Sequence, residues 1–204
     1  MFQLKKFPIQ TTHLLAPLLL LIVALCCFVF NSQISETFIY KRSLIADHQY
    51  WRLFSGHVFH TNYAHLLLNT LAIILLWALH GQYYSTKQYF KLVFFSSIAI
   101  SFGIYFFTPE MSEYVGLSGV LHALFVWGAL KDIEHNEKTG YLLILGAIIK
   151  IIHEQWFGAS EEIAQLIHAN VAIDAHLWGA ISGLSYYLLS YFSKKVEKKP
   201  ALSD

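Results

Sequence analysis

Five long stretches of the sequence contain no Asp, Glu, Lys or Arg, and this lack of charge constrains the fold more than any other feature. The stretches are residues 7–35, 53–86, 92–109, 114–130 and 175–193. A helix needs about 20 mainly apolar residues to cross a bilayer, within a range of about 17–25. Only 13% of the 204 residues are charged, against roughly 25% in an ordinary soluble domain. The sequence therefore predicts a membrane protein.

A sixth stretch, residues 140–158, is apolar at its start but is interrupted by Lys150, His153 and Glu154. Lys150 either snorkels or pairs with Glu154, four residues further on. Counting this stretch, we predict an all-α membrane protein with six spans. A signal peptide is the alternative for the first stretch, but its length and the lack of a small-residue cleavage site favour a retained helix. The predicted spans are residues 9–30, 57–80, 90–108, 115–131, 140–158 and 174–193.

Basic residues gather on one side of the predicted bundle. The positive-inside rule therefore assigns both termini to the cytoplasm. The net charge of +1 gives no reason to expect a nucleic-acid partner. The residues on the basic side are Lys5, Lys6, Lys87, Lys91, Lys131, Lys138, Lys194, Lys195, Lys198 and Lys199.

The quartet Gly116-Leu117-Ser118-Gly119 begins the predicted fourth span. A serine between glycines at the start of a helix offers an exposed hydroxyl, and the unpaired N–H groups there favour a developing negative charge. Ser118 is thus a candidate nucleophile. The alternative is an ordinary helix N-cap, a position where serine is common.

His176 lies at the start of the sixth predicted span and shares one helical face with Gly179 and Gly183. Small residues with this spacing let two membrane helices approach closely. The fourth span offers a matching pair, Gly119 and Ala123. Packing of the two faces would bring His176 within about 2.6–3.2 Å of the serine, as a general base requires.

A second histidine competes for the role of base. His122 follows Ser118 by four residues and shares its helical face. We favour His176, because a base needs an aligned hydrogen bond rather than mere closeness. Asp174 precedes His176 by two residues and so points away on a helix. The sequence therefore predicts a Ser–His dyad with no acid to orient the base.

Histidines also gather at the start of the second predicted span. His65 and Asn69 share one face, and both side chains are suitable hydrogen-bond donors for an oxyanion. The competing reading is metal ligation by His57, His60 and His65, but their spacing fits no common zinc pattern. The run from His153 lacks the second histidine of H-E-x-x-H. We predict neither a metal nor a cofactor.

Taken together, these motifs resemble the rhomboid family of intramembrane serine proteases. The similarity covers the second, fourth and sixth spans and the Trp51-Arg52 pair in the first long connection. It implies that residues 1–204 form one rhomboid-like membrane domain in which Ser118 attacks and His176 moves the proton. It also implies that His65, Asn69 and the Ser118 N–H hold the oxyanion. The further residues that it implies as supporting are Gly116, Gly119, His60 and His122.

Within that family the sequence is most similar to the rhombosortases. The similarity rests on residues 116–122, Gly-Leu-Ser-Gly-Val-Leu-His, and on Asp174-Ala175-His176-Leu177, with Ala123 as a departure where glycine is expected. It implies a protein of the bacterial inner membrane whose active site opens to the periplasm. The implied substrates are surface or secreted proteins that end in a Gly-Gly pair, one anchor span and a basic tail.

Two other functions are possible for such a chain. One is a catalytically inert rhomboid-like protein that binds client helices, against which the presence of both dyad residues argues. The other is a proton-coupled transporter, which also uses histidines within the membrane. A transporter needs polar residues through the full membrane depth, whereas here they gather on one side.

Overall fold

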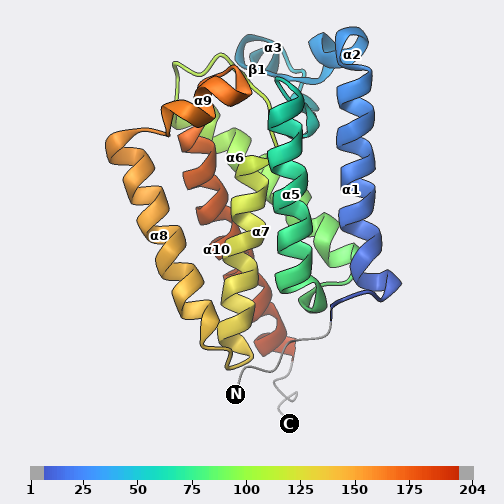
Figure 1. Ribbon diagram of the computed structural model, residues 1–204, viewed down its shortest axis with the longest axis vertical. Coiled ribbons are helices and arrows are strands. Elements are labelled where there is room, and N and C mark those ends of the chain that lie inside the picture. Colours follow the sequence, from blue (N-terminus) through green and yellow to red (C-terminus); the bar gives the residue numbers. More distant parts are fainter. Residues whose placement is uncertain (1–6, 198–204) are drawn as a thin grey trace, which may run out of the picture.

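The computed structural model describes residues 7–197, and six long helices run side by side within them (Figure 1). The start of α1 and the end of α10 lie at one end of the bundle, and α2, α3, β1 and α9 lie at the other. We call the end that carries α2, α3, β1 and α9 the distal end. The long helices are α1 (Thr11–Val29), α5 (Tyr63–His80), α6 (Thr86–Phe107), α7 (Ser118–Glu134), α8 (Thr139–Phe157) and α10 (Ile173–Glu197).

Within the described residues, three segments are long and apolar enough to cross a membrane. They are α1, α5 together with the 3₁₀ helix η2 (Gly81–Tyr83), and α6. A fourth is added if α8 and the short helix α9 (Glu161–Ile167), bent by 87°, form one broken span. These segments confirm a helical membrane fold, while the count of six spans stays a prediction.

The outward faces of the long helices are apolar. Many large apolar side chains on α1, α5, α6, α8 and α10 are more than half exposed, which is unusual for a soluble monomer and is what contact with lipid requires. Examples are Leu25, Leu71, Phe94, Leu142 and Leu189.

The first long connection folds into several short elements at the distal end (Figure 1). They are α2 (Asn31–Phe38), β1 (Tyr40–Lys41), α3 (Arg42–Ala46), α4 (Arg52–Ser55) and the 3₁₀ helix η1 (Gly56–Val58). The buried Arg52 guanidinium donates to the carbonyl oxygens of Ile39 at 2.7 Å and Glu36 at 2.9 Å. The Arg52 side chain therefore ties the start of α4 to the end of α2 within this connection.

A two-stranded antiparallel sheet links this connection to the segment before α7. Tyr40 in β1 pairs with Tyr114 in β2 (Glu113–Tyr114). The chain then runs through Gly116 directly into α7. The sheet thus determines where the chain enters the helix that begins at Ser118.

Helices α7 and α10 approach each other closely through small residues. A Cβ atom added to Gly179 would lie 2.1 Å from the carbonyl oxygen of Gly119, and one added to Gly183 would lie 2.3 Å from that of Ala123. Real Cβ atoms essentially never come this close. The contact that the spacing of small residues predicted is therefore present, and it brings the starts of the two helices together.

Candidate active site

Ser118 is the first residue of α7, and its hydroxyl does not cap that helix, because Leu117 occupies the N-cap position. The preceding loop turns at Gly116, whose φ of +122° is a conformation that favours glycine. The Tyr114 hydroxyl donates to the Gly116 carbonyl oxygen at 2.7 Å and fixes this turn. In the first turn of a helix the backbone N–H groups have no intrahelical acceptor.

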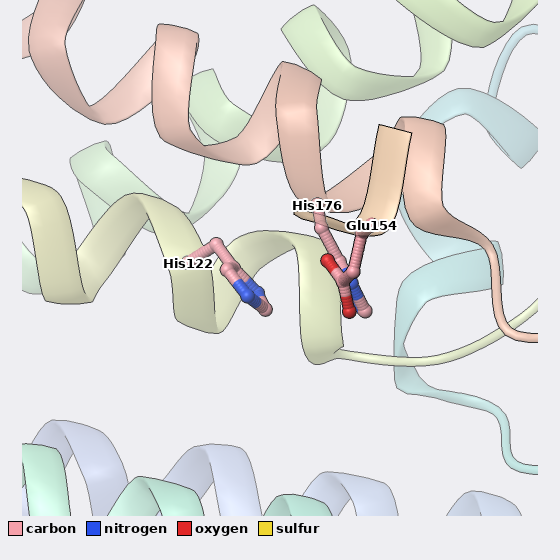
Figure 2. Close-up of side chains that lie close together, drawn as sticks. All are labelled: His122, Glu154 and His176. Carbon is pink, nitrogen blue, oxygen red and sulfur yellow. The ribbon is translucent and has the colours of Figure 1, made fainter. Parts of the chain in front are cut away.

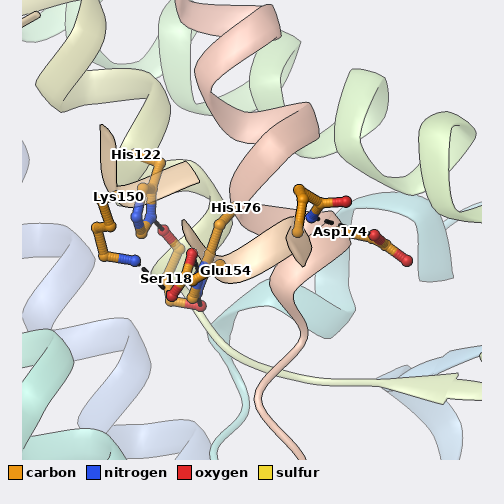
Figure 3. A network of polar contacts seen from close by, with 7 residues as sticks. Ser118, His122, Lys150, Glu154, Asp174 and His176 are labelled. Carbon is orange, nitrogen blue, oxygen red and sulfur yellow. Dashed lines mark hydrogen bonds and ion pairs between the residues drawn. The ribbon is translucent and has the colours of Figure 1, made fainter. Parts of the chain in front are cut away.

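His176, in the first turn of α10, faces the serine. Its Nε2 lies 3.0 Å from Ser118 Oγ, and its Nδ1 lies 2.9 Å from Glu154 Oε2 (Figure 3). An ionised carboxylate can only accept a hydrogen bond, so this contact assigns a proton to Nδ1. The lone pair of Nε2 is then free to accept the proton of the Ser118 hydroxyl. The imidazole is thus in the tautomer that a general base needs.

Glu154 was not among the site residues predicted from the sequence, and the expectation that no acid orients the histidine is wrong for this structure. The carboxylate comes from α8, a different helix from either partner, and it is buried. Its second oxygen, Oε1, accepts from Lys150 Nζ at 2.6 Å, one of the two alternatives given for Lys150. Asp174, nearer in sequence, accepts instead from Thr108 Oγ1 at 3.0 Å. The signals in the sequence were the Lys four residues before this Glu and the position of an ionisable residue within a predicted span.

His122 lies beside the pair but makes a different contact. Its Nδ1 is 2.7 Å from the backbone carbonyl oxygen of Ser118, which can only accept. Its ring stacks on that of His176, with centroids 4.2 Å apart and planes at 18° (Figure 2). His122 therefore contacts the backbone of the serine, whereas His176 contacts the hydroxyl.

The predicted oxyanion donors His65 and Asn69 lie on α5, and His65 lies next to the serine loop. A Cβ atom added to Gly116 would lie 2.8 Å from Nε2 of His65. The Nδ1 atom of His65 is 3.1 Å from the Thr61 hydroxyl oxygen, and the buried His60 ring packs edge-on against it at 5.0 Å. Asn69 is buried, and its amide nitrogen has no hydrogen-bond partner among the described residues. Asn69 thus offers an unpaired buried donor, whereas His65 lines the cavity that adjoins Ser118.

A cavity of about 710 Å³ adjoins Ser118 at the distal end. His60, Thr61 and His65 line one part of it, and residues after α9 line another. Acidic side chains contribute to the wall, among them Glu110 and Asp174. The cavity is large enough to admit water and a segment of extended chain to the hydroxyl.

A second serine–histidine contact lies outside this cavity. His57 Nε2 is 3.0 Å from Ser101 Oγ and also 3.0 Å from the Ser97 carbonyl oxygen. Because a carbonyl only accepts, Nε2 must carry the proton and cannot take one from the serine. The Ser101 hydroxyl itself donates to the Leu53 carbonyl at 2.7 Å, and both side chains are buried. This contact has the features of a structural hydrogen bond between helices.

The structure offers little support for the alternative of a metal site at His57, His60 and His65. Among the described residues, the potential ligand atoms that lie within 4.8 Å of one another belong to a different group, which consists of His122, Glu154 and His176 (Figure 2). Both ring nitrogens of His176 already have partners. In addition, the lone pair of an imidazole nitrogen lies in the plane of its ring. The stacked rings of His122 and His176 therefore direct their lone pairs within nearly parallel planes. They cannot converge on one ion at about 2.0–2.1 Å.

Fold and site together define a membrane helix bundle with a hydrogen-bonded serine–histidine pair beside a cavity. The family described as the Rhomboid domain matches residues 47–192, which is more than half of the chain. The chain therefore belongs to the rhomboid family.

Two relatives come from Bacillus subtilis (strain 168). The rhomboid protease GluP is 28% identical over 145 residues, which are 70% of this chain and 26% of GluP. YdcA, provisionally named a rhomboid protease, is 26% identical over 155 residues, which are 76% of this chain and 72% of YdcA. The chain thus spans about a quarter of the length of GluP.

Proposed function

We propose that this chain is an intramembrane serine protease with Ser118 as nucleophile and His176 as general base. The observation that carries the proposal is the 3.0 Å contact between Ser118 Oγ and His176 Nε2, in a histidine whose Nδ1 donates to a carboxylate. Membership of the rhomboid family supports the same activity, since the relatives are named as rhomboid proteases.

The reaction follows from these positions. Ser118 Oγ attacks the carbonyl carbon of the scissile peptide bond while its proton passes to His176 Nε2. The oxyanion accepts hydrogen bonds from the Ser118 N–H, His65 and Asn69. His176 then returns the proton to the leaving amine, which breaks the C–N bond and leaves an acyl ester on Ser118. Water from the cavity, deprotonated by His176, hydrolyses that ester and restores the enzyme.

The proposed setting is a bacterial inner membrane crossed six times, with the distal end facing the periplasm. Lys87, Lys91, Lys131 and Lys138 lie in or near the turns at the opposite end, and the positive-inside rule assigns that end to the cytoplasm. The basic residues Lys5, Lys6, Lys198 and Lys199 lie outside the described residues. This arrangement exposes the cavity beside Ser118 to water rather than to lipid.

For the substrate we propose the rhombosortase class: proteins with a C-terminal Gly-Gly pair, one anchor helix and a basic tail. A peptide bond inside a helix must first lose its helical hydrogen bonds. Glycine weakens a helix by about 1 kcal/mol relative to alanine, so a Gly-Gly pair helps the segment to unwind into the cavity. Replacing that pair by Leu-Leu in a test substrate should prevent its processing. Unchanged processing would indicate a broader specificity.

Reconstituted protein tests the activity itself. Wild-type protein in liposomes should cleave a purified substrate of this kind, and Ser118→Ala should abolish cleavage while the fold is retained. Ser101→Ala is the matched control, since it removes the other serine hydroxyl in contact with a histidine, and it should still cleave. Cleavage by Ser118→Ala above background would refute the proposal, and binding without cleavage by the wild type would favour an inert relative.

A further inference from the structure

A continuous polar chain runs from α8 to the serine. Lys150 Nζ donates to Glu154 Oε1 at 2.6 Å, Glu154 Oε2 accepts from His176 Nδ1 at 2.9 Å, and His176 Nε2 lies 3.0 Å from Ser118 Oγ (Figure 3). Three helices thus supply one line of contacts. The two carboxylate oxygens are each engaged by a different partner, which fixes the plane of the carboxylate.

The burial of Glu154 is not required by the packing of α8. Next to it, Ala147 and Ile151 on α8 and Leu177 on α10 line one apolar pocket, so the neighbouring surfaces of these helices are apolar. Burying a carboxylate costs desolvation energy that pairing with a cation often fails to recover, so an apolar residue of similar size would hold the helices together as well or better. Ionisable groups within a membrane helix generally mark a functional site.

We propose that Glu154 is a positioning residue for His176, an inference that rests on the proposed function. It holds the imidazole with its proton on Nδ1 and its lone pair on Nε2, aimed at the Ser118 hydroxyl. When Ser118 attacks, its proton passes to Nε2, and the carboxylate stabilises the imidazolium without taking a proton itself. Lys150 acts one step further out by holding Glu154. The catalytic group is therefore a chain of acid, base and nucleophile rather than an isolated dyad.

The decisive variant is Glu154→Gln, which keeps the size of the side chain. Its amide can donate to Nδ1, and this would leave the proton on Nε2, where the ring cannot accept from Ser118. By analogy with the loss of the acid in other triads, kcat should fall roughly 10²–10⁴-fold, while KM for the test substrate stays within about threefold because no substrate contact is removed. Glu154→Asp keeps the charge and should recover part of the lost rate.

Glu134→Gln is the matched control. Glu134 also pairs with a lysine on its own helix, Lys131, but at the far end of α7 from Ser118. This variant makes the same chemical change to another Glu–Lys pair and should keep wild-type kcat.

Lys150→Met tests the outer link of the chain. Alone it should lower kcat less than Glu154→Gln does. Combined with Glu154→Gln it should add nothing, because Lys150 acts through the carboxylate. A further loss in the double variant would assign Lys150 a role of its own and contradict this part of the inference.

A tautomer measurement separates positioning from mere structural support. In protein labelled with ¹⁵N-histidine, with His176 assigned by its absence in His176→Ala, the wild type should show a protonated Nδ1 and an unprotonated Nε2. Glu154→Gln should populate the opposite tautomer even if its thermal unfolding temperature is unchanged.

The outcomes distinguish this inference from the proposed function. If Ser118→Ala and His176→Ala abolish cleavage but Glu154→Gln keeps kcat within about threefold and the same tautomer, the positioning role alone is refuted. If cleavage does not depend on Ser118 at all, the protease function fails and the inference fails with it. Loss of kcat in Glu154→Gln together with the altered tautomer establishes the role.

Discussion

The close contact between α7 and α10 makes Gly179→Ala the most informative single change away from the polar site. The added Cβ atom would lie 2.1 Å from the Gly119 carbonyl oxygen, whereas real Cβ atoms essentially never come within 3.0 Å of a non-bonded heavy atom elsewhere in the chain. The obstacle is backbone, which cannot rotate away as a side chain does. The two helices must therefore separate locally by at least about 0.9 Å to accept one methyl group, as the difference between those distances requires.

This separation acts directly on the catalytic contact. His176 precedes Gly179 by one helical turn, and Ser118 is adjacent to Gly119, so both partners move with the backbones that are forced apart. The contact between Ser118 and His176 would lengthen from 3.0 Å to nearly 4 Å, outside the hydrogen-bonding range of about 2.7–3.2 Å. A misplacement of about 1 Å in an active site can cost roughly 10²-fold in rate, and we expect a loss of that size in kcat.

The assay is cleavage of the reconstituted test substrate, with thermal unfolding measured on the same preparations. Gly146→Ala is the control, since a Cβ atom there meets nothing within 4 Å and the change should only favour the helix. It should keep wild-type kcat. A Gly179→Ala protein with both wild-type kcat and wild-type stability would refute the claim that the glycine contact aligns the two residues.

Three further predictions concern the surroundings of the pair. His65→Ala and Asn69→Ala should each lower kcat by roughly 10²–10³-fold if each is a main oxyanion donor, and full activity in the double variant would exclude that role. Gly116→Ala should lower stability by roughly 1–3 kcal/mol through backbone strain and should also lower kcat, because its Cβ atom would displace His65. Gly158→Ala, at φ +80° with no neighbour within 4 Å, is the control for strain alone and should keep wild-type kcat. A metal chelator should leave the rate of cleavage unchanged, and a loss that zinc restores would revive the metal reading.

Much of the fold could be predicted from composition alone, because a bilayer admits few alternatives. The charge-free stretches at residues 7–35 and 53–86 contain α1 and α5 with η2, and the stretch at 92–109 covers most of α6; these three segments are long and apolar enough to cross a membrane. The spacing of small residues also predicted the contact between α7 and α10, because a close approach of two backbones requires small residues four apart on each helix. The lack of charge and the spacing of small residues can each be read along a single helix.

Glu154 could not be predicted in the same way. It lies 22 residues before His176, in a predicted span where polar residues interrupt the apolar pattern. Which face of α8 packs against α10 depends on how the whole bundle is arranged, and no periodic pattern in the sequence of α8 indicates that face. The lysine four residues earlier was visible in the sequence, but such pairs are common on solvated helices. Only the burial of the carboxylate in three dimensions distinguishes this one.

The most direct test of the central claim is labelling with a fluorophosphonate probe, followed by mass spectrometry of the modified peptide. The probe forms a covalent bond only with a serine whose hydroxyl is activated by a base. The adduct should form on Ser118, persist in His122→Ala and disappear in His176→Ala. An adduct on Ser101, or labelling of Ser118 that survives the loss of His176, would contradict the assignment of the nucleophile and its base.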